Sequence, residues 1–182
     1  MDRGASCYRR FLAGQESAFD EIMELLFHRL VFFIDRYVQD PYEAEDLAIE
    51  TMTELVVHPK KYRFTVSLKT YLFLLGKSKA LDYLRKKNRR KTEPVEAVGE
   101  TVSSEAGLED QLQLQEQQRL VHEALAKLPQ EMSAVLHLIY FEELSYEDAA
   151  KVMKKSRKQV DNLIYRGKKE LRQILGKEAI VL

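Results

Sequence analysis

The chain has 182 residues, of which 45% are apolar, so it can form packed cores and is not a wholly disordered protein. Its 7 glycines and 4 prolines argue against a β-sandwich or barrel and favour an all-α fold, while the single cysteine excludes an internal disulfide. The 29 basic residues balance the 29 acidic ones, but the two kinds occupy different segments, so the net charge of zero is a poor guide to partners.

Residues 1–58 form an acidic helical block with 12 acidic residues against 5 basic ones. Apolar side chains recur at three- and four-residue steps from Phe19 to Tyr37, which predicts one long amphipathic helix or two stacked ones. Asp40 and Pro41 interrupt the pattern, and a second helix follows with an apolar stripe of Leu47, Ala48, Leu55 and Val56. No signal peptide and no apolar run of about 18 residues is visible, so we expect a cytoplasmic protein without membrane insertion.

The charge reverses in residues 59–91, which hold 12 basic residues against 1 acidic one. Pro59 ends the preceding helix, a basic aromatic loop follows, and from Ser67 the apolar spacing predicts a helix that runs into a cluster of cations. Like charges gathered this closely repel one another unless a polyanion neutralises them. Nucleic acid is therefore the leading partner on charge alone.

The loop before this basic helix contains Tyr62, Arg63 and Phe64. Such a sequence suits single-stranded DNA, because bases stack on aromatic faces while cations hold the phosphates. The alternative is that the two rings pack beneath the loop and contribute only to the core.

A polar, acidic stretch separates this block from the C-terminal one. Helical periodicity vanishes from Thr92 to about Gly107 and resumes at Leu112, so we predict a flexible linker over 92–110. Pro129 is expected in the first turn of a further helix, a position that proline tolerates.

The C-terminal block contains two helix-start signals close together. Residues 145–148 resemble a capping box, and a second one begins eleven residues later at Ser156. This spacing predicts a short helix over 146–153, a tight turn and a second helix whose outer face is basic and rich in hydrogen-bonding groups. Such a helix-turn-helix fits a DNA major groove. An ordinary helical corner with a solvated outer face is the alternative.

Enzymatic interpretations find no support in the sequence. Its histidines, His28, His58, His122 and His137, are scattered, and no HExxH motif, Cys–His pair or glycine-rich phosphate loop is present. We therefore expect no catalytic residue, no metal site and no cofactor.

The order of these segments resembles bacterial RNA polymerase sigma factors of the extracytoplasmic-function type, the small members of the sigma-70 family. Residues 14–19 are similar to the family's GD-x-x-AF opening, and residues 42–47 to its D-A-E-D-L helix. Residues 71–85 are similar to its W-L-x-x-I-A-R-N-x-x-x-D-x-x-R helix, and residues 128–166 to its L-P…L-S-Y-E-E-I-A…V-K-S-x-L-x-R-A pattern. The resemblance covers nearly the whole chain.

Some positions depart from the family pattern. Tyr71 replaces the usual tryptophan, and Asp161 places an acid on the helix that would read DNA. Lys154 and Lys155 stand where the turn normally carries glycine. Lys154 therefore needs a less demanding turn, or adopts a positive φ at a modest cost in strain. These departures bear on promoter preference rather than on family.

The resemblance implies a sigma factor made of two small helical domains. Residues 1–91 would form a region 2-like domain that binds core polymerase and recognises and melts the −10 element. Residues 111–182 would form a region 4-like helix-turn-helix domain that recognises the −35 element, with the acidic linker over 92–110 between them. The implied partners are core RNA polymerase, promoter DNA in duplex and single-stranded form, and an anti-sigma factor.

The resemblance also suggests three sets of binding residues. For the −10 region these are Tyr62, Arg63, Phe64, Lys69, Tyr71, Lys77, Ser78, Lys79, Arg85, Lys86 and Arg89, with Asp82 expected to orient Arg85 or Lys86 as an ion pair. For the −35 region they are Ser156, Arg157, Lys158, Gln159, Asn162, Arg166, Lys169 and Arg172, of which Ser156 and Gln159 act first as caps. The polymerase-binding set is Glu43, Glu45, Asp46 and Glu50.

Two other functions remain open on sequence alone. A helix-turn-helix regulator would bind duplex DNA without polymerase, and it would not need the aromatic loop or the acidic motif at 43–46. A helical protein–protein adaptor would have basic faces that are only solvated, and it would show no salt-dependent affinity for DNA.

Overall fold

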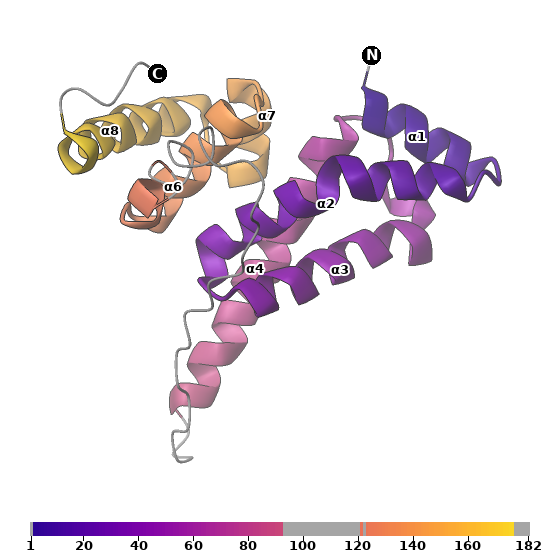
Figure 1. The fold of residues 1–182 in the computed structure, drawn as a ribbon, viewed down its shortest axis with the longest axis horizontal. Helices are drawn as coiled ribbons and strands as arrows, with labels where there is room; N and C mark the ends of the chain where they lie inside the picture. The colour runs from indigo at the N-terminus through magenta and orange to yellow at the C-terminus, as the bar shows by residue number, and fades with distance from the viewer. Residues whose placement is uncertain (1, 93–120, 122, 177–182) are drawn as a thin grey trace, which may run out of the picture.

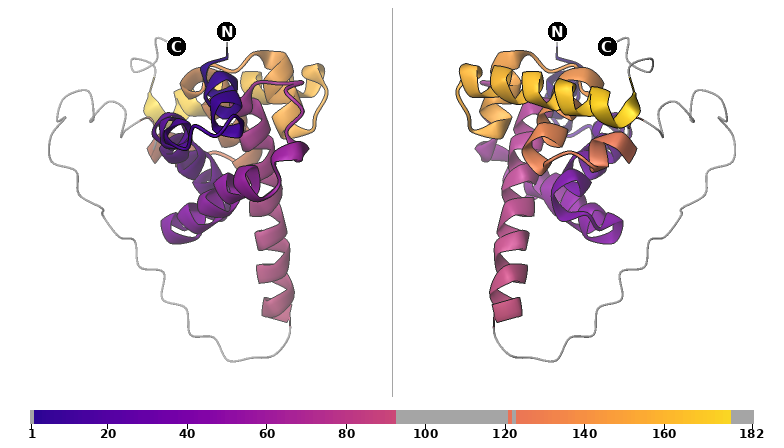
Figure 2. Two further views of the ribbon diagram at one scale, coloured as in Figure 1. Left: turned by 90° about the vertical axis from the view of Figure 1, so that its right-hand side faces the viewer. Right: turned by 90° about the vertical axis from the view of Figure 1, so that its left-hand side faces the viewer.

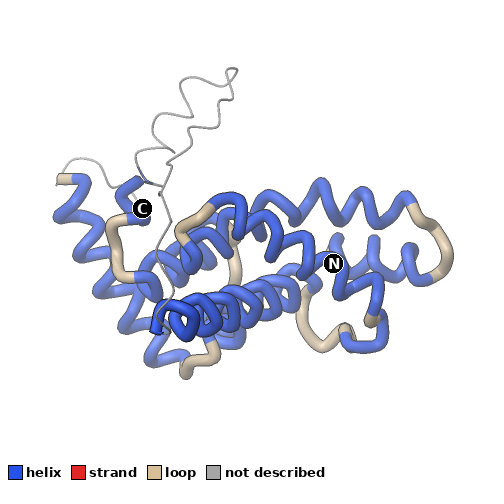
Figure 3. Tube along the Cα trace, turned by 90° about the horizontal axis from the view of Figure 1, so that it is seen from below, coloured by secondary structure: helices blue, strands red, loops and turns tan. Residues whose placement is uncertain are grey.

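The computed structural model describes residues 2–92, 121 and 123–176, and every regular element in that part of the chain is helical (Figures 1 and 3). The all-α prediction is therefore confirmed. The N-terminal half consists of α1 (Arg3–Leu12), α2 (Ser17–Val38), α3 (Pro41–Val57), a 3₁₀ turn (Pro59–Lys61) and α4 (Leu68–Thr92). The C-terminal half contains α6 (Gln130–Leu136), a π-helical turn (His137–Phe141), α7 (Tyr146–Met153) and α8 (Arg157–Leu175).

The turn between α2 and α3 follows the sequence signal. Gln39 ends α2 in the left-handed conformation, with φ of 52°. The Asp40 carboxylate then caps α3 by accepting hydrogen bonds from the backbone N–H groups of Tyr42 and Glu43, and Pro41 occupies the first turn. This tight turn folds α3 back along α2, and the two helices lie side by side in Figure 1.

The core of the N-terminal half lies between α2 and α4. The ring of Phe33 on α2 packs 4.9 Å from that of Phe73 on α4, centroid to centroid, and both are fully buried. Gly76 permits this close approach, because a Cβ atom there would lie 2.8 Å from a side-chain methyl of Leu30. On the other side of the bundle, the buried hydroxyl of Tyr8 donates to the Leu55 carbonyl at 2.7 Å and fixes α1 to α3.

The C-terminal half contains the predicted helix-turn-helix. Ser145 caps α7, and both hydrogen bonds of the capping box between Ser156 and Gln159 are present at the start of α8. Lys154 ends α7 with φ of 53°, so a lysine adopts the left-handed backbone conformation that glycine adopts with less strain. The buried side of α8 is formed by Val160, Ile164, Gly167 and Leu171.

The N-terminal and C-terminal halves correspond to the two small helical domains that the sequence predicts, and they pack against each other so that their buried residues form one continuous hydrophobic core. Helix α7 packs on α4, and α6 packs on α2. Figure 2 shows this arrangement from two sides, with the C-terminal end of α4 projecting beyond the rest of the molecule. The predicted linker lies outside the described residues apart from Thr92, the last residue of α4.

Candidate nucleic-acid interface

The aromatic residues of the loop before α4 point into the protein. Tyr62 is only 4% exposed, and its hydroxyl donates to the Val66 carbonyl at 2.8 Å. Its ring lies 4.6 Å from that of Phe64 and 5.0 Å from that of Tyr71, and burial raises the pKa of Tyr62 to about 12. The Phe64 ring is partly covered by the Arg9 guanidinium, 4.8 Å from its centroid. The Tyr62 ring therefore has no face free for a base in this structure. For Tyr62 this agrees with the alternative that the rings pack beneath the loop.

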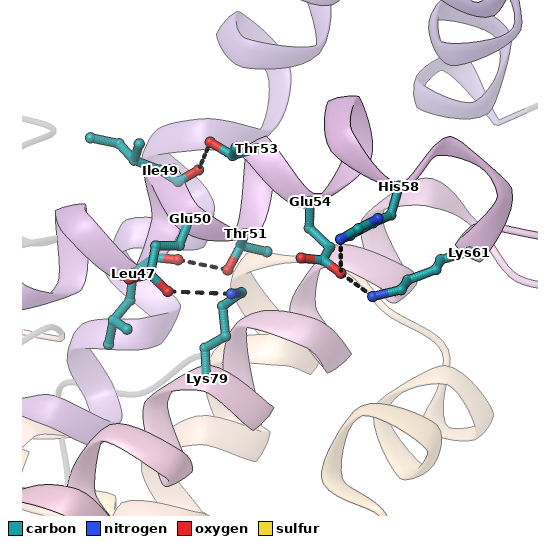
Figure 4. A network of polar contacts seen from close by, with 9 residues as sticks. All are labelled: Leu47, Ile49, Glu50, Thr51, Thr53, Glu54, His58, Lys61 and Lys79. Atoms are coloured by element: carbon teal, nitrogen blue, oxygen red, sulfur yellow. Dashed lines mark hydrogen bonds and ion pairs between the residues drawn. The ribbon is translucent and has the colours of Figure 1, made fainter.

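The cations of the same loop border an open pocket of about 630 Å³. Arg63 is exposed, unlike the tyrosine and phenylalanine on either side of it. Lys61 donates to the Glu54 carboxylate, and this hydrogen bond lowers the pKa of Glu54 (Figure 4). The residues that line the pocket are Val57, His58, Pro59, Lys60, Lys61 and Arg63. The pocket is therefore positively charged and its size suits a nucleotide.

Helix α4 divides its cations between two faces. Lys77 is 7% exposed and donates to the Met153 carbonyl, and Lys69 donates to the Glu142 carbonyl, so both contact the C-terminal half. On another face, Lys79 pairs with Glu50 of α3 at 3.3 Å (Figure 4). Ser78 is half-buried.

The end of α4 that projects from the body carries the remaining cations of this set, Arg85, Lys86 and Arg89, all of which are exposed (Figure 2). Asp82 forms an ion pair with Arg85 at 2.9 Å, so the predicted pairing of this acid with a neighbouring cation is present. Exposed cations on a projecting helix have the charge and the placement that suit contact with a phosphate backbone.

The outer face of α8 carries Lys158, Asn162 and Lys169, all exposed. At 100° per residue they form one stripe, and Tyr165, 73% exposed, lies in it. The predicted −35 set does not include this tyrosine, although the helical spacing places it on the outer face. Arg166 and Arg172 are exposed on either side of the stripe.

The start of α8 is held against α7. Arg157 donates to the Glu147 carboxylate, and its guanidinium lies 5.8 Å from the centroid of the Tyr146 ring. Ser156 and Gln159 satisfy each other's backbone N–H groups as caps, as predicted. In this structure Arg157 therefore fixes the start of α8 to α7, while the outer stripe of α8 remains exposed.

Helix α3 presents an exposed face that is both acidic and apolar. Glu45 and Asp46 are exposed, and Glu50 is exposed although it pairs with Lys79. Glu43 is half-buried near the helix start. The same face carries three exposed large apolar side chains at seven-residue intervals, namely Tyr42, Ile49 and Val56.

The apolar members of this face were not identified from the sequence. Val56 in particular was expected in the buried stripe, and this was wrong: its neighbour Leu55 is 2% exposed and fills that position, whereas Val56 is 46% exposed. Exposed apolar side chains among acids are typical of a protein contact.

The described residues contain no group of three or more metal-ligating side chains. None of the helices within those residues combines the length and the apolar character that a membrane crossing requires.

Comparison with known proteins gives two family matches. Sigma-70 region 2 matches residues 22–90, and Sigma-70 region 4 matches residues 118–171. The chain is 23% identical to the ECF RNA polymerase sigma factor SigM of Bacillus subtilis over 158 residues, 87% of this chain and 95% of that protein. It is 26% identical to the RNA polymerase sigma-H factor of Pseudomonas aeruginosa over 174 residues, 91% of this chain and 90% of that protein.

Two solved structures share the fold. The sigma factor RpoE of Bartonella quintana, in complex with the anti-sigma factor NepR, superposes with a TM-score of 0.68 at 23% identity over 86% of this chain and 96% of that one. CnrH, in complex with the cytosolic domain of CnrY, gives a TM-score of 0.62 at 18% identity over 97% of this chain and 98% of that one.

Proposed function

We propose that this chain, which belongs to the extracytoplasmic-function group of the sigma-70 family of RNA polymerase sigma factors, binds core RNA polymerase and places it at promoters through two separate DNA contacts. Sigma factors act in transcription initiation without being enzymes, which agrees with a sequence that has no catalytic motif. The chain would act in the cytoplasm, where polymerase and DNA are found.

The observation that carries the proposal is the outer stripe of α8. A helix that starts at a capping box, packs on α7 and presents Lys158, Asn162, Tyr165 and Lys169 outward has the geometry of a major-groove reader. Asn162 suits bidentate pairing with adenine, while Lys169 suits a phosphate. This helix would read the duplex −35 element.

The second DNA contact involves the loop before α4 and the cations of α4. Because the Tyr62 ring is internal, we propose that the basic pocket beside Lys61 and Arg63 receives an unstacked base of the melted −10 strand. Arg85, Lys86 and Arg89 would hold the phosphates. Tyr62 and Phe64 would then act by supporting the loop.

The exposed face of α3 would bind the polymerase. Glu45 and Asp46 repel DNA but suit a basic protein surface, and Ile49 and Val56 supply apolar area between them. An anti-sigma factor is a further proposed partner, since the structurally similar sigma factor RpoE was solved in complex with the anti-sigma factor NepR. A duplex-binding regulator would need neither this face nor the basic pocket.

The test is transcription from promoter fragments by purified core polymerase with and without the chain. We expect initiation that depends on the chain and on a two-part promoter sequence. Equal transcription in its absence would contradict the proposal.

A further inference from the structure

The N-terminal part of α8 carries an exposed acid among side chains that suit DNA. Lys158, Asp161, Asn162 and Tyr165 are all exposed, and none of the four forms a side-chain hydrogen bond or an ion pair with the described residues. Asp161 stands out, because α8 has six basic residues and a carboxylate repels the phosphates that those residues attract. Its presence on this face therefore needs a physical reason.

Stabilisation of α8 itself does not supply that reason. Asp161 is the fifth residue of the helix, beyond the first turn in which an acid gains most from the helix dipole. An ion pair with Arg157, four residues earlier, would have the less favourable order of charges along the helix. The structure does not form that pair, because the Arg157 guanidinium donates to Glu147 and lies over the Tyr146 ring, both on α7. The contact between the two helices thus leaves the Asp161 carboxylate without a cation.

Helix geometry places Asp161 at the edge of the outer stripe of α8. At 100° per residue, Tyr165 lies about 40° from Asp161 around the helix axis, and Lys158 lies about 60° from it. These residues belong to the N-terminal part of the second helix of the helix-turn-helix, the part that contacts base edges when such a helix lies in a major groove. In that position the carboxylate meets bases rather than the phosphate backbone.

The chemistry of the base edges decides which base an acid tolerates there. A carboxylate only accepts hydrogen bonds, and in the major groove cytosine offers the N4 amino group as a donor. Guanine offers the acceptors O6 and N7, which repel a carboxylate, and thymine offers an acceptor and a methyl group. Adenine has an amino group but places the acceptor N7 beside it, an arrangement that suits an amide better than an acid. Cytosine is therefore the base that fits Asp161.

We propose that Asp161 is a specificity-determining residue of α8, which accepts a hydrogen bond from the N4 amino group of one cytosine in the duplex upstream element and repels guanine at that position. The inference rests on the proposed function in one respect, namely that α8 lies in the major groove of duplex DNA. Asp161 contributes little to affinity for DNA in general, because its charge opposes phosphate binding. Its effect is a difference between bases, produced by one attraction and one repulsion.

The preference can be measured by selection from a pool of duplex DNA with a randomised segment. The full-length chain is used both alone and bound to core polymerase, and the selected duplexes are sequenced. The test variants are Asp161→Ala, which removes the acceptor, and Asp161→Asn, which replaces the acid by an amide. The matched control is Glu170→Gln, which removes the other acid of α8: Glu170 is half-buried and lies about 180° around the helix from Asp161.

We expect the unaltered chain and Glu170→Gln to select a shared element with cytosine at one position. Asp161→Ala should select the same element without a preference there, and Asp161→Asn should favour adenine, because an amide pairs bidentately with that base. In titrations, replacing the cytosine by guanine should weaken binding of the unaltered chain by about 5- to 10-fold and that of Asp161→Ala by less than about 2-fold. Circular dichroism checks that the variants fold, and Asp161→Asn gives a second reading at the same position.

The inference and the proposed function fail in different ways. A shared element selected with polymerase, whose base preferences are the same for the unaltered chain and Asp161→Ala, would support the sigma factor and overturn the role of Asp161. A cytosine preference that depends on Asp161 but appears only with the chain alone would support that role and contradict the sigma factor. Selection of no shared element in either form would overturn both.

Discussion

The ammonium nitrogen of Lys77 lies 2.6 Å from the backbone carbonyl oxygen of Met153, 76 residues further along the chain. Lys77 belongs to the most basic segment of the sequence, yet it contacts the protein's own C-terminal half. The charge of a segment thus indicates that it can bind a polyanion, whereas the arrangement of the helices decides which of its cations are exposed.

The packing of the C-terminal half on the N-terminal half should become more favourable as the pH rises, because Lys77 lies between them. Burial lowers the pKa of Lys77 to about 8, against a usual value of about 10.4 that we expect once the halves separate. Between these two values the open chain binds more protons than the closed one, so raising the pH favours closure. The neighbouring charges are Glu131, Lys154 and Lys155. Energy transfer between dyes attached at Asp20→Cys on α2 and Gln173→Cys on α8, in a Cys7→Ala background, should increase between pH 7 and 9.5, and Lys77→Met should abolish the increase.

A decrease in transfer over that pH range in the unaltered chain would contradict this assignment. Lys79→Met is the matched control and should keep the pH dependence, because the Lys79 ammonium pairs with Glu50 within the N-terminal half.

Tyr62 should contribute to stability far more than its place in a basic loop suggests. Its buried ring packs on Phe64 and Tyr71, so Tyr62→Ala should lower the free energy of unfolding by about 3–5 kcal/mol. Tyr165→Ala is the control: that side chain is 73% exposed, and its replacement should change stability by less than about 0.5 kcal/mol. Urea denaturation of both variants is the measurement, and equal stabilities would show that the Tyr62 ring is not a core residue.

The exposed face of α3 should be required for polymerase binding. Reversing the charges of Glu45 and Asp46 to lysine should weaken binding to core polymerase by at least about 10-fold, because like charges then meet at the interface. Ile49→Ala should weaken it through lost apolar contact. The same two charge changes at Asp20 and Glu24, exposed on α2, form the control and should leave affinity unchanged in a titration with labelled chain.

The two DNA contacts should differ in the form of DNA that they need. Asn162→Ala should reduce holoenzyme affinity for duplex promoter by about 1–3 kcal/mol, while Gln173→Ala, further along α8, should not. Arg63→Ala should bind the closed duplex nearly normally but lose affinity for a promoter with a pre-melted −10 element. Equal defects of the Asn162 and Arg63 variants on duplex DNA would favour a plain duplex-binding regulator.

Local signals predicted the fold well. Asp40 and Pro41 at the start of α3, Pro59 after its end, and the capping box at Ser156 all act through hydrogen bonds and backbone geometry within a few residues. The pair between Asp82 and Arg85 is equally local. Such features depend little on the rest of the chain, so they can be predicted from the sequence.

Features set by contacts distant in sequence were harder to predict. Whether Tyr62 or Arg63 faces outward depends on packing against Tyr8, more than fifty residues earlier. The burial of Lys77 depends on α7 docking against α4, which no periodicity reveals. For the candidate site, residue type therefore indicated the chemistry, while the tertiary structure decided which side chains are free to perform it.

Reconstituted transcription tests the sigma-factor assignment most directly. Purified core polymerase is incubated with a library of promoter fragments in three reactions. The first contains the unaltered chain, the second contains no added chain, and the third contains the Glu45→Lys, Asp46→Lys variant. We predict that transcripts starting at a fixed distance from a shared two-part sequence appear only with the unaltered chain. A chain that binds duplex DNA without polymerase, and adds no transcript to those of core polymerase alone, would contradict the assignment.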